Sequence, residues 1–275
     1  MYKMRFKYRD LEKAKAFFKE NGFAVFEDVL TDEDINNFLK AYDECIKEEK
    51  IKWKEEAAFD AINDAIFLHP VFEEYVKDKR LVNIAETLLG TEIELQHSKI
   101  SDKPRLKKEG ETKEAVEWHQ DFPFFPHTNF DMLALTIHLD DEDEDSGVLR
   151  MIPKSHKNQL SHCENREFMY KCTEKIDDSK AETLTGKKGM ITIHHGLTLH
   201  ASAPRNKGEH RRTMLYQYRA RDAIQIAGVI WKCYGYQVKE YKTPRIARLE
   251  GGIKFEIRGD NGRLYDKYGK LAPDK

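Results

Sequence analysis

LLGTEIEL, residues 88–95, is the stretch at which the chain changes from helical to β-type sequence. Gly90 favours the left-handed conformation that commonly ends a helix. The residues before it carry apolar side chains at helical spacing, and β-type residues take over after it. This order, helices first and strands afterwards, predicts an α+β protein that is mainly β.

The part of the chain before this stretch contains further helical patterns. Apolar residues recur at helical spacing from Leu11 until Gly22, and a short apolar strand over Phe23–Val29 follows. Thr31 can cap a second helix, which is expected to end near Lys50. Two more helices are expected after Pro70 and after Asp78.

The part after Gly90 is dominated by short strands bounded by turn residues. The expected strands are Glu92–Ile100, Val116–Asp121, Met132–Leu139, Val148–Ile152, Met190–His194 and Thr213–Arg219. No helical crossover separates most of them, as a parallel sheet would require. An antiparallel double sheet of jelly-roll type is therefore favoured over a doubly wound sheet.

The length of 275 residues is enough to bury one good hydrophobic core, and no linker-like segment marks a domain boundary. We therefore predict a single domain over residues 1–275. Its parts are a helical region of about 1–90, a jelly-roll core of about 91–235 and a C-terminal hairpin extension of about 236–275. Asp260, Asn261 and Gly262 predict the turn of that hairpin.

Composition excludes several classes of function. The 47 basic and 49 acidic residues leave a formal net charge of -2, so no global basic field attracts nucleic acid. No signal-peptide core opens the sequence, and no run of about eighteen apolar residues could span a membrane. The four cysteines form no CxxC pair, which favours reduced thiols. A soluble, cytoplasmic protein is expected, as a monomer or homodimer.

The segment EWHQDF, residues 117–122, carries the chemistry. His119 and Asp121 are separated by one residue, so on a strand they project from the same face. A third candidate ligand, His200, follows the apolar strand MITIH. Two imidazoles and one carboxylate form the facial triad of Fe(II) oxygenases, whereas a zinc site is more often closed. Arg211, eleven residues after His200, is suited to gripping a carboxylate with two hydrogen bonds.

Three ordered segments resemble the phytanoyl-CoA dioxygenase family. They are WHQDFPFF, LDDEDEDSGVLRMIPKSHK and HHGLTLHASAPRNKGEHRRTM, and the resemblance covers about residues 90–220. It implies a double-stranded β-helix, a cupin-like jelly roll with N-terminal helices packed on one sheet. It also implies Fe(II) bound by His119, Asp121 and His200, with 2-oxoglutarate and molecular oxygen as co-substrates.

The same resemblance implies where 2-oxoglutarate binds. Its 2-oxo acid end would chelate the iron and its far carboxylate would pair with Arg211, assisted by Ser202. Thr136 stands where many members carry a tryptophan, and Lys99 stands on a strand that flanks the co-substrate. Arg212 is expected to point to the opposite strand face.

The reaction implied by the family is hydroxylation of an unactivated carbon of a small molecule, with release of succinate and carbon dioxide. Asp121 argues against halogenation, because related halogenases replace this carboxylate with a small residue. Desaturation and cyclisation stay open. The alternatives from other classes are a catalytically silent jelly-roll protein that binds metal or ligand, a protein hydroxylase or interaction protein, and a zinc hydrolase.

Several other features have a structural interpretation. The phenylalanines at 122, 124 and 125 suit a substrate pocket or loop packing equally well. The acidic run Asp140–Asp145 is interpreted as a solvated turn and the basic stretch from Lys103 to Lys108 as a solvated loop. A satisfied core or surface position is favoured for the remaining histidines considered, namely His97, His138, His156, His194 and His195, although His194 or His195 could support the metal site.

Overall fold

The computed structural model describes residues 4–52, 60–103, 116–163, 171–203, 205, 210–241 and 243–253. Its helices are α1 (Leu11–Asn21), α2 (Asp32–Lys47), α3 (Pro70–Val76) and α4 (Lys79–Leu89). Its strands are β1 (Phe23–Phe26), β2 (Asp60–Asn63), β3 (Ile93–Asp102), β4 (Val116–His119), β5 (Met132–His138), β6 (Leu149–Met151), β7 (His162–Cys163), β8 (Lys171–Cys172), β9 (Glu182–Thr183), β10 (Ile191–His195), β11 (His200–Ser202) and β12 (Arg212–Ala220). The predicted hairpin at 260–262 lies outside the described residues.

The helices begin and end where the local sequence predicts. The Thr31 side chain accepts a hydrogen bond from the backbone of Asp34, whose carboxylate accepts one from the backbone of Thr31, so α2 starts with a capping box. Asp78 caps α4 with a single hydrogen bond, which its side chain accepts from the backbone of Arg80. α1 and α4 both end at a glycine with positive φ, Gly22 and Gly90. Because these signals are local, all four predicted helices are confirmed, with α2 ending a little before Lys50.

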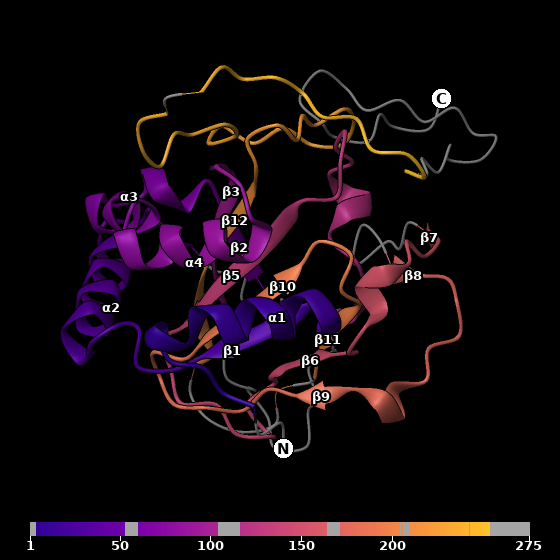
Figure 1. Cartoon of the computed structure of the whole chain (residues 1–275). Helices are drawn as coiled ribbons and strands as arrows, with labels where there is room; N and C mark the ends of the chain where they lie inside the picture. The colour runs from indigo at the N-terminus through magenta and orange to yellow at the C-terminus, as the bar shows by residue number, and fades with distance from the viewer. Residues whose placement is uncertain are drawn as a thin grey trace, which may run out of the picture.

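Two antiparallel sheets form the β part of the molecule. The larger has the order β1-β10-β5-β12-β3-β2 and the smaller the order β4-β11-β6-β9. The helices gather at one side of the larger sheet (Figure 1). This arrangement of two antiparallel sheets with helices on one of them confirms the predicted jelly-roll fold.

The larger sheet has two chemically different faces. The hydroxyls of Tyr216 and Tyr218 on β12 donate to the backbone carbonyls of Phe72 and Val76 on α3, so the even positions face the helices. Lys99 and Ser101 of β3 and Thr213 and Leu215 of β12 lie on the other face, toward the smaller sheet. Apolar residues of the helices and of the sheet face that contacts them make up the main core. The space between the two sheets is left for polar side chains.

The strand predictions fail at particular places. β4 ends at His119, and Asp121 already has helical dihedral angles at the start of a short 3-10 turn, so the expected strand to Asp121 is two residues too long. The strands that were not predicted are all short, namely β2, β7, β8, β9 and β11. β2 depends on pairing with β3, and β11 on pairing with β4 and β6, which a local pattern cannot show.

Cys45 and Cys233 are buried free thiols, as expected. No helix in the described ranges is long and apolar enough to cross a membrane.

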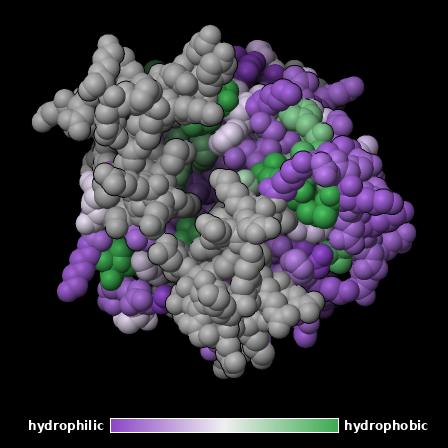
Figure 2. Space-filling view, turned by 180° about the vertical axis from the view of Figure 1, so that it is seen from behind, coloured by the Kyte–Doolittle hydropathy of each residue, from purple (hydrophilic) through white to green (hydrophobic). Residues whose placement is uncertain are grey.

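On the face opposite to that of Figure 1, the described residues are largely hydrophilic, and hydrophobic residues appear beside a recess near its middle (Figure 2).

Gly22 connects the helical part to the loop that leads to His200. Its carbonyl accepts hydrogen bonds from the backbone of His195 at 2.8 Å and from the hydroxyl of Thr198 at 2.6 Å. A Cβ atom at Gly22 would come within 2.6 Å of that hydroxyl and would also meet the ring of His156. The end of α1 therefore fixes the position of the loop before β11.

We expect Gly22→Ala to lower the free energy of unfolding more than Gly90→Ala does. Both glycines have positive φ, which costs an L residue roughly 1–2 kcal/mol, but a Cβ at Gly90 meets nothing within 4 Å. Only Gly22→Ala adds a steric clash. Denaturant unfolding of both variants measures the difference, and equal losses would show that the contact with the loop is unimportant.

Candidate metal centre

The two sheets bring the predicted ligand residues together. β11 pairs with β4 so that His200 lies directly opposite His119. The Nε2 atoms of His119 and His200 lie 3.8 Å and 3.7 Å from Oδ1 of Asp121. One ligand atom from each of these residues lies within 4.8 Å of the other two, a separation that a single ion can bridge. All three side chains are largely buried.

Hydrogen bonds orient both imidazoles. Nδ1 of His119 lies 2.8 Å from the carbonyl of Glu117, and Nδ1 of His200 lies 2.9 Å from the carbonyl of Thr198. Because a carbonyl only accepts, each Nδ1 carries the proton and each Nε2 presents its lone pair. Burial lowers the pKa of His119 to about 4 and that of His200 well below its usual value. Both rings are therefore neutral, as metal ligands must be.

The carboxylate of Asp121 is held at one oxygen and left open at the other. Oδ2 accepts hydrogen bonds from Nε2 of His194 at 3.1 Å and from Nε2 of Gln217 at 3.0 Å. Oδ1 faces the two ligand histidines. Burial acts to raise the pKa of Asp121, but the neighbouring imidazoles outweigh it and hold the pKa well below its usual value. The carboxylate is thus ionised and presents one oxygen to a cation.

The sequence does not assign Gln217 to the site, and for His194 it favours a core position while leaving support of the metal site open. His194 is buried and contacts Asp121, which favours the supporting role. Gln217 could have been found, because it follows Arg211, the residue directly before β12, at even spacing and so shares the face of Arg211.

We expect His194→Phe and Gln217→Leu each to weaken metal binding by roughly 10–100-fold, the usual cost of removing a partner that orients a ligand. Tyr216→Phe is the matched control, since Tyr216 neighbours Gln217 but faces the helices. Titration of the apo-protein with Mn(II), followed by calorimetry, gives the dissociation constants. Unchanged metal affinity in both variants would show that Asp121 needs neither donor.

A narrow cavity of about 80 Å³ opens beside the three candidate ligands. The side chains that the resemblance implies for 2-oxoglutarate all line it, namely Arg211, Ser202, Thr136 and Lys99. Ser202, Thr136 and Lys99 lie on β11, β5 and β3, strands of both sheets, and Arg211 directly precedes β12. The cavity therefore lies between the sheets and connects the candidate ligands with the candidate clamp.

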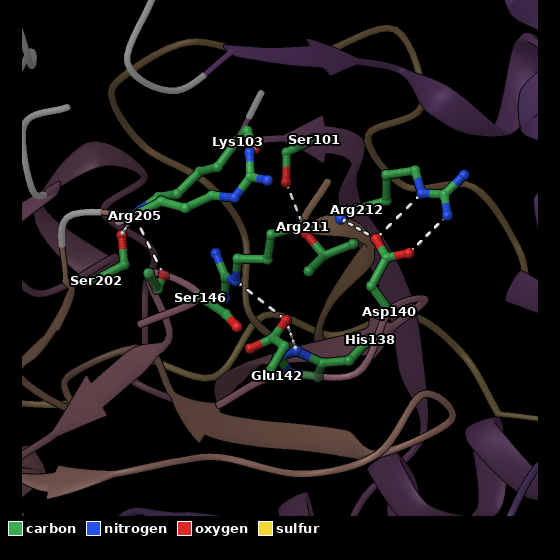
Figure 3. Close-up of polar contacts among 12 residues, drawn as sticks. Ser101, Lys103, His138, Asp140, Glu142, Ser146, Ser202, Arg205, Arg211 and Arg212 are labelled. Carbon is green, nitrogen blue, oxygen red and sulfur yellow. Dashed lines mark hydrogen bonds and ion pairs between the residues drawn. The ribbon is translucent and has the colours of Figure 1, made fainter. Parts of the chain in front are cut away.

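Arg211 lies at one end of this cavity and is fixed by a buried carboxylate. Its Nε donates to Oε1 of Glu142 at 3.0 Å, and the same oxygen lies 2.7 Å from Nδ1 of His138 (Figure 3). His138 in turn contacts the hydroxyl of Thr192 at 2.9 Å. Glu142 belongs to the acidic run interpreted as a solvated turn, and for this residue the interpretation is wrong. The run folds inward at Glu142 because a buried arginine requires a partner.

Lys103 lies near the same end of the cavity. Its Nζ donates to the hydroxyl of Ser202 at 2.8 Å and to the carbonyl of Ala203 at 2.7 Å. Burial lowers the pKa of Lys103 to about 6. The interpretation of a solvated basic loop is thus wrong for Lys103, and Arg105, Lys107 and Lys108 lie outside the described residues. The hydroxyl oxygen of Ser202 accepts this hydrogen bond from Lys103, so the hydroxyl proton of Ser202 can be donated to another group.

Arg212 and the phenylalanine loop have structural roles. Arg212 forms a two-pronged ion pair with Asp140 and does not line the cavity, as predicted for the opposite strand face (Figure 3). Phe122 and Phe125 pack in a small core with Met132 and Leu197, which favours loop packing over a pocket for these two rings. Phe124 packs its edge against His119 at 5.7 Å between ring centroids.

The donor set fits a divalent iron ion. Two neutral imidazoles and one ionised carboxylate oxygen converge from one side, and this triad leaves other positions of an octahedral ion open. No further His, Cys, Asp or Glu joins the group within the described part of the chain. The fold and the site together define a jelly-roll protein with a two-histidine, one-carboxylate centre.

The chain belongs to the phytanoyl-CoA dioxygenase (PhyH) family, which matches it over residues 18–214. The family predicted from the three sequence segments is thereby confirmed. The chain is 37% identical over 161 residues to the probable alpha-ketoglutarate-dependent hypophosphite dioxygenase of Stutzerimonas stutzeri, covering 56% of this chain and 54% of that protein. It is 25% identical over 273 residues to the peroxisomal phytanoyl-CoA dioxygenase of Rattus norvegicus, covering 90% and 79%. The match thus spans about half the length of the first relative and most of the second.

Solved structures share the fold at low sequence identity. The epimerase SnoN, in complex with Fe3+, alpha ketoglutarate and nogalamycin RO, superposes with a TM-score of 0.69 at 19% identity and covers 88% of this chain and 96% of its own. EctD from S. alaskensis, with 2-oxoglutarate and 5-hydroxyectoine, gives a TM-score of 0.60 at 20% identity and covers 81% and 79%. These likenesses establish the jelly-roll architecture over most of the chain.

Proposed function

We propose that this protein is an Fe(II)- and 2-oxoglutarate-dependent dioxygenase that hydroxylates a small molecule. The observation that carries the proposal is the meeting of an open metal triad and a buried arginine in one cavity. The triad alone would suit other metal proteins, and an arginine alone would suit other anions. Their combination suits a ligand with a chelating 2-oxo acid at one end and a carboxylate at the other.

The residues of the chain have separate roles in this proposal. His119, Asp121 and His200 hold Fe(II), which when bound supplies the redox chemistry that uses molecular oxygen and 2-oxoglutarate. Arg211 binds the far carboxylate of 2-oxoglutarate, and Glu142 and His138 keep the guanidinium in place.

Ser202 donates its hydroxyl proton to the same carboxylate, because Lys103 already occupies the oxygen of that hydroxyl. Thr136 and the apolar side chains of Leu149 and Leu215 form the walls of the cavity. Such walls exclude water from the reacting groups.

In the proposed reaction, 2-oxoglutarate and oxygen yield succinate and carbon dioxide while one oxygen atom enters the substrate as a hydroxyl group. Desaturation and cyclisation remain alternative outcomes of the same chemistry. The likeness to a hypophosphite dioxygenase supports a small polar substrate and adds oxidation at phosphorus, hypophosphite to phosphite, to the outcomes that should be screened.

The proposal can be tested without knowing the substrate. Anaerobic addition of Fe(II) and then 2-oxoglutarate to the apo-protein is expected to produce the weak visible charge-transfer band of the chelated complex. Admission of oxygen with candidate substrates, among them hypophosphite, should then release succinate. If Fe(II) binds but no band forms, the protein is a metal-binding jelly roll without the proposed activity.

A further inference from the structure

Lys99 is a lysine of the cavity to which the described residues offer no partner. It lies on the inner face of β3, directly opposite Leu215 of β12, and its side chain lines the same cavity as His119, Asp121 and His200. Within the part of the chain that the structure describes, its ammonium group makes no hydrogen bond and no ion pair. A half-buried charge without a partner is unusual, because buried charges are normally paired.

The other cations around the cavity are all satisfied. Arg211 is paired with Glu142, and Lys103 donates to Ser202, Ala203 and Gly147. Leu149 and Leu215 of the cavity wall are apolar, and among the described residues no hydrogen bond joins Lys99 to a hydroxyl such as that of Thr136. Lys99 therefore differs from Arg211 and Lys103, the cations at the far-carboxylate end of the cavity, because both of these have partners among the described residues.

The charges expected at the metal end leave Lys99 uncompensated. This step rests on the proposed function. The two positive charges of Fe(II) are balanced by the carboxylate of Asp121 and by the chelating carboxylate of 2-oxoglutarate, while both ligand histidines are neutral. Asp121 acts on Lys99 electrostatically, but its oxygens are already taken by the metal site and by His194 and Gln217. One positive charge remains beside the metal.

We propose that Lys99 is the recognition group for the primary substrate, and that this substrate is a small monoanion. A phosphorus oxyanion and a short carboxylate share the necessary chemistry, which is one negative charge next to an oxidisable hydrogen. Burial lowers the pKa of Lys99, and an anion bound to the amine would offset that effect. In this proposal Lys99 binds the substrate and not 2-oxoglutarate, which replaces the co-substrate role that the family resemblance implied.

The proposal is tested by binding, without turnover, on the protein loaded with Mn(II) and 2-oxoglutarate under argon. Calorimetry with hypophosphite and with acetate as probes gives the anion affinity of wild type, Lys99→Met and Lys99→Arg. Lys157→Met is the matched control, because Lys157 is an exposed lysine in the short 3-10 turn over Ser155–Lys157 and does not line the cavity. We expect Lys99→Met to weaken the better probe at least about tenfold, as loss of one charge-assisted hydrogen bond implies. Lys99→Arg should keep part of the anion affinity, because it keeps the positive charge. The affinity for 2-oxoglutarate should change less than about twofold in Lys99→Met and in Lys99→Arg, well below the roughly tenfold loss of anion affinity.

The outcomes separate this inference from the proposed function. Tighter binding of hypophosphite identifies a phosphorus oxyanion as the substrate type, and tighter binding of acetate identifies a carboxylate. If Lys99→Met weakens 2-oxoglutarate as much as the anion, Lys99 serves the co-substrate and the inference is overturned. It is also overturned if wild type binds 2-oxoglutarate but neither anion. Failure of wild type to bind 2-oxoglutarate at all would instead contradict the proposed function.

Discussion

His200→Ala protein is expected to form no succinate above the level of metal-free protein. The substitution removes one of three ligands and leaves His119 and Asp121 as a pair. The loss of metal affinity should exceed the roughly 10–100-fold expected for a residue that only orients a ligand. The same variant should lack the visible band that Fe(II) and 2-oxoglutarate give with wild type.

The measurement combines metal titration with succinate release. His69→Asn is the matched control, because His69 is an imidazole on the helical side that caps α3 and asparagine also caps helices well. The control should keep wild-type metal affinity and activity. If His200→Ala retains Fe(II)-dependent succinate release, the centre does not depend on this triad, and the assignment of His200 fails.

The helical part shows why some of the fold could be predicted. Thr31, Asp78, Gly22 and Gly90 act on their own helix ends through bonds to residues a few positions away. Such interactions are written into consecutive letters of the sequence. Among the predicted strands, β5 and β12 are long, and both lie within one residue of their expected bounds.

The parts that were missed depend on residues far apart in the chain. β11 becomes a strand because β4 and β6 lie on either side of it. Glu142 is buried because Arg211, 69 positions later, ends beside it, and no local pattern distinguishes it from its solvated neighbours. The acidic composition of the run favoured the surface, but one buried guanidinium outweighs that tendency at a single position.

The candidate site could be predicted only in part, because some of its residues are neighbours in the sequence and others are far apart. His119 and Asp121 are near neighbours, and His200 and Arg211 were inferred from their positions after the strand MITIH, with the resemblance supporting both. A local pattern cannot pair His194 with Asp121, because these residues are 73 positions apart. The even spacing of Gln217 from Arg211, which directly precedes β12, is a further signal that could have added a supporting residue to the metal site.

Arg211→Met is expected to weaken 2-oxoglutarate binding by roughly 10- to 150-fold, because charge-assisted hydrogen bonds contribute about 1.5–3 kcal/mol. Metal affinity should stay unchanged, since the side chain of Arg211 pairs with Glu142 and not with His119, Asp121 or His200. 2-Oxobutanoate, which lacks the far carboxylate, should bind wild type and variant equally. Calorimetry of both ligands on the Mn(II)-loaded protein measures the effect.

Loss of Arg211 also leaves the carboxylate of Glu142 buried beside His138, which can cost about 3–5 kcal/mol of stability. The double variant Arg211→Met, Glu142→Gln removes that charge, so it separates binding from folding. It should recover stability in denaturant unfolding without recovering affinity for 2-oxoglutarate. Arg212→Met, which breaks the ion pair with Asp140 on the opposite face, should leave 2-oxoglutarate affinity unchanged. If the double variant binds 2-oxoglutarate as tightly as wild type, Arg211 is a structural partner of Glu142 and the clamp belongs to another residue.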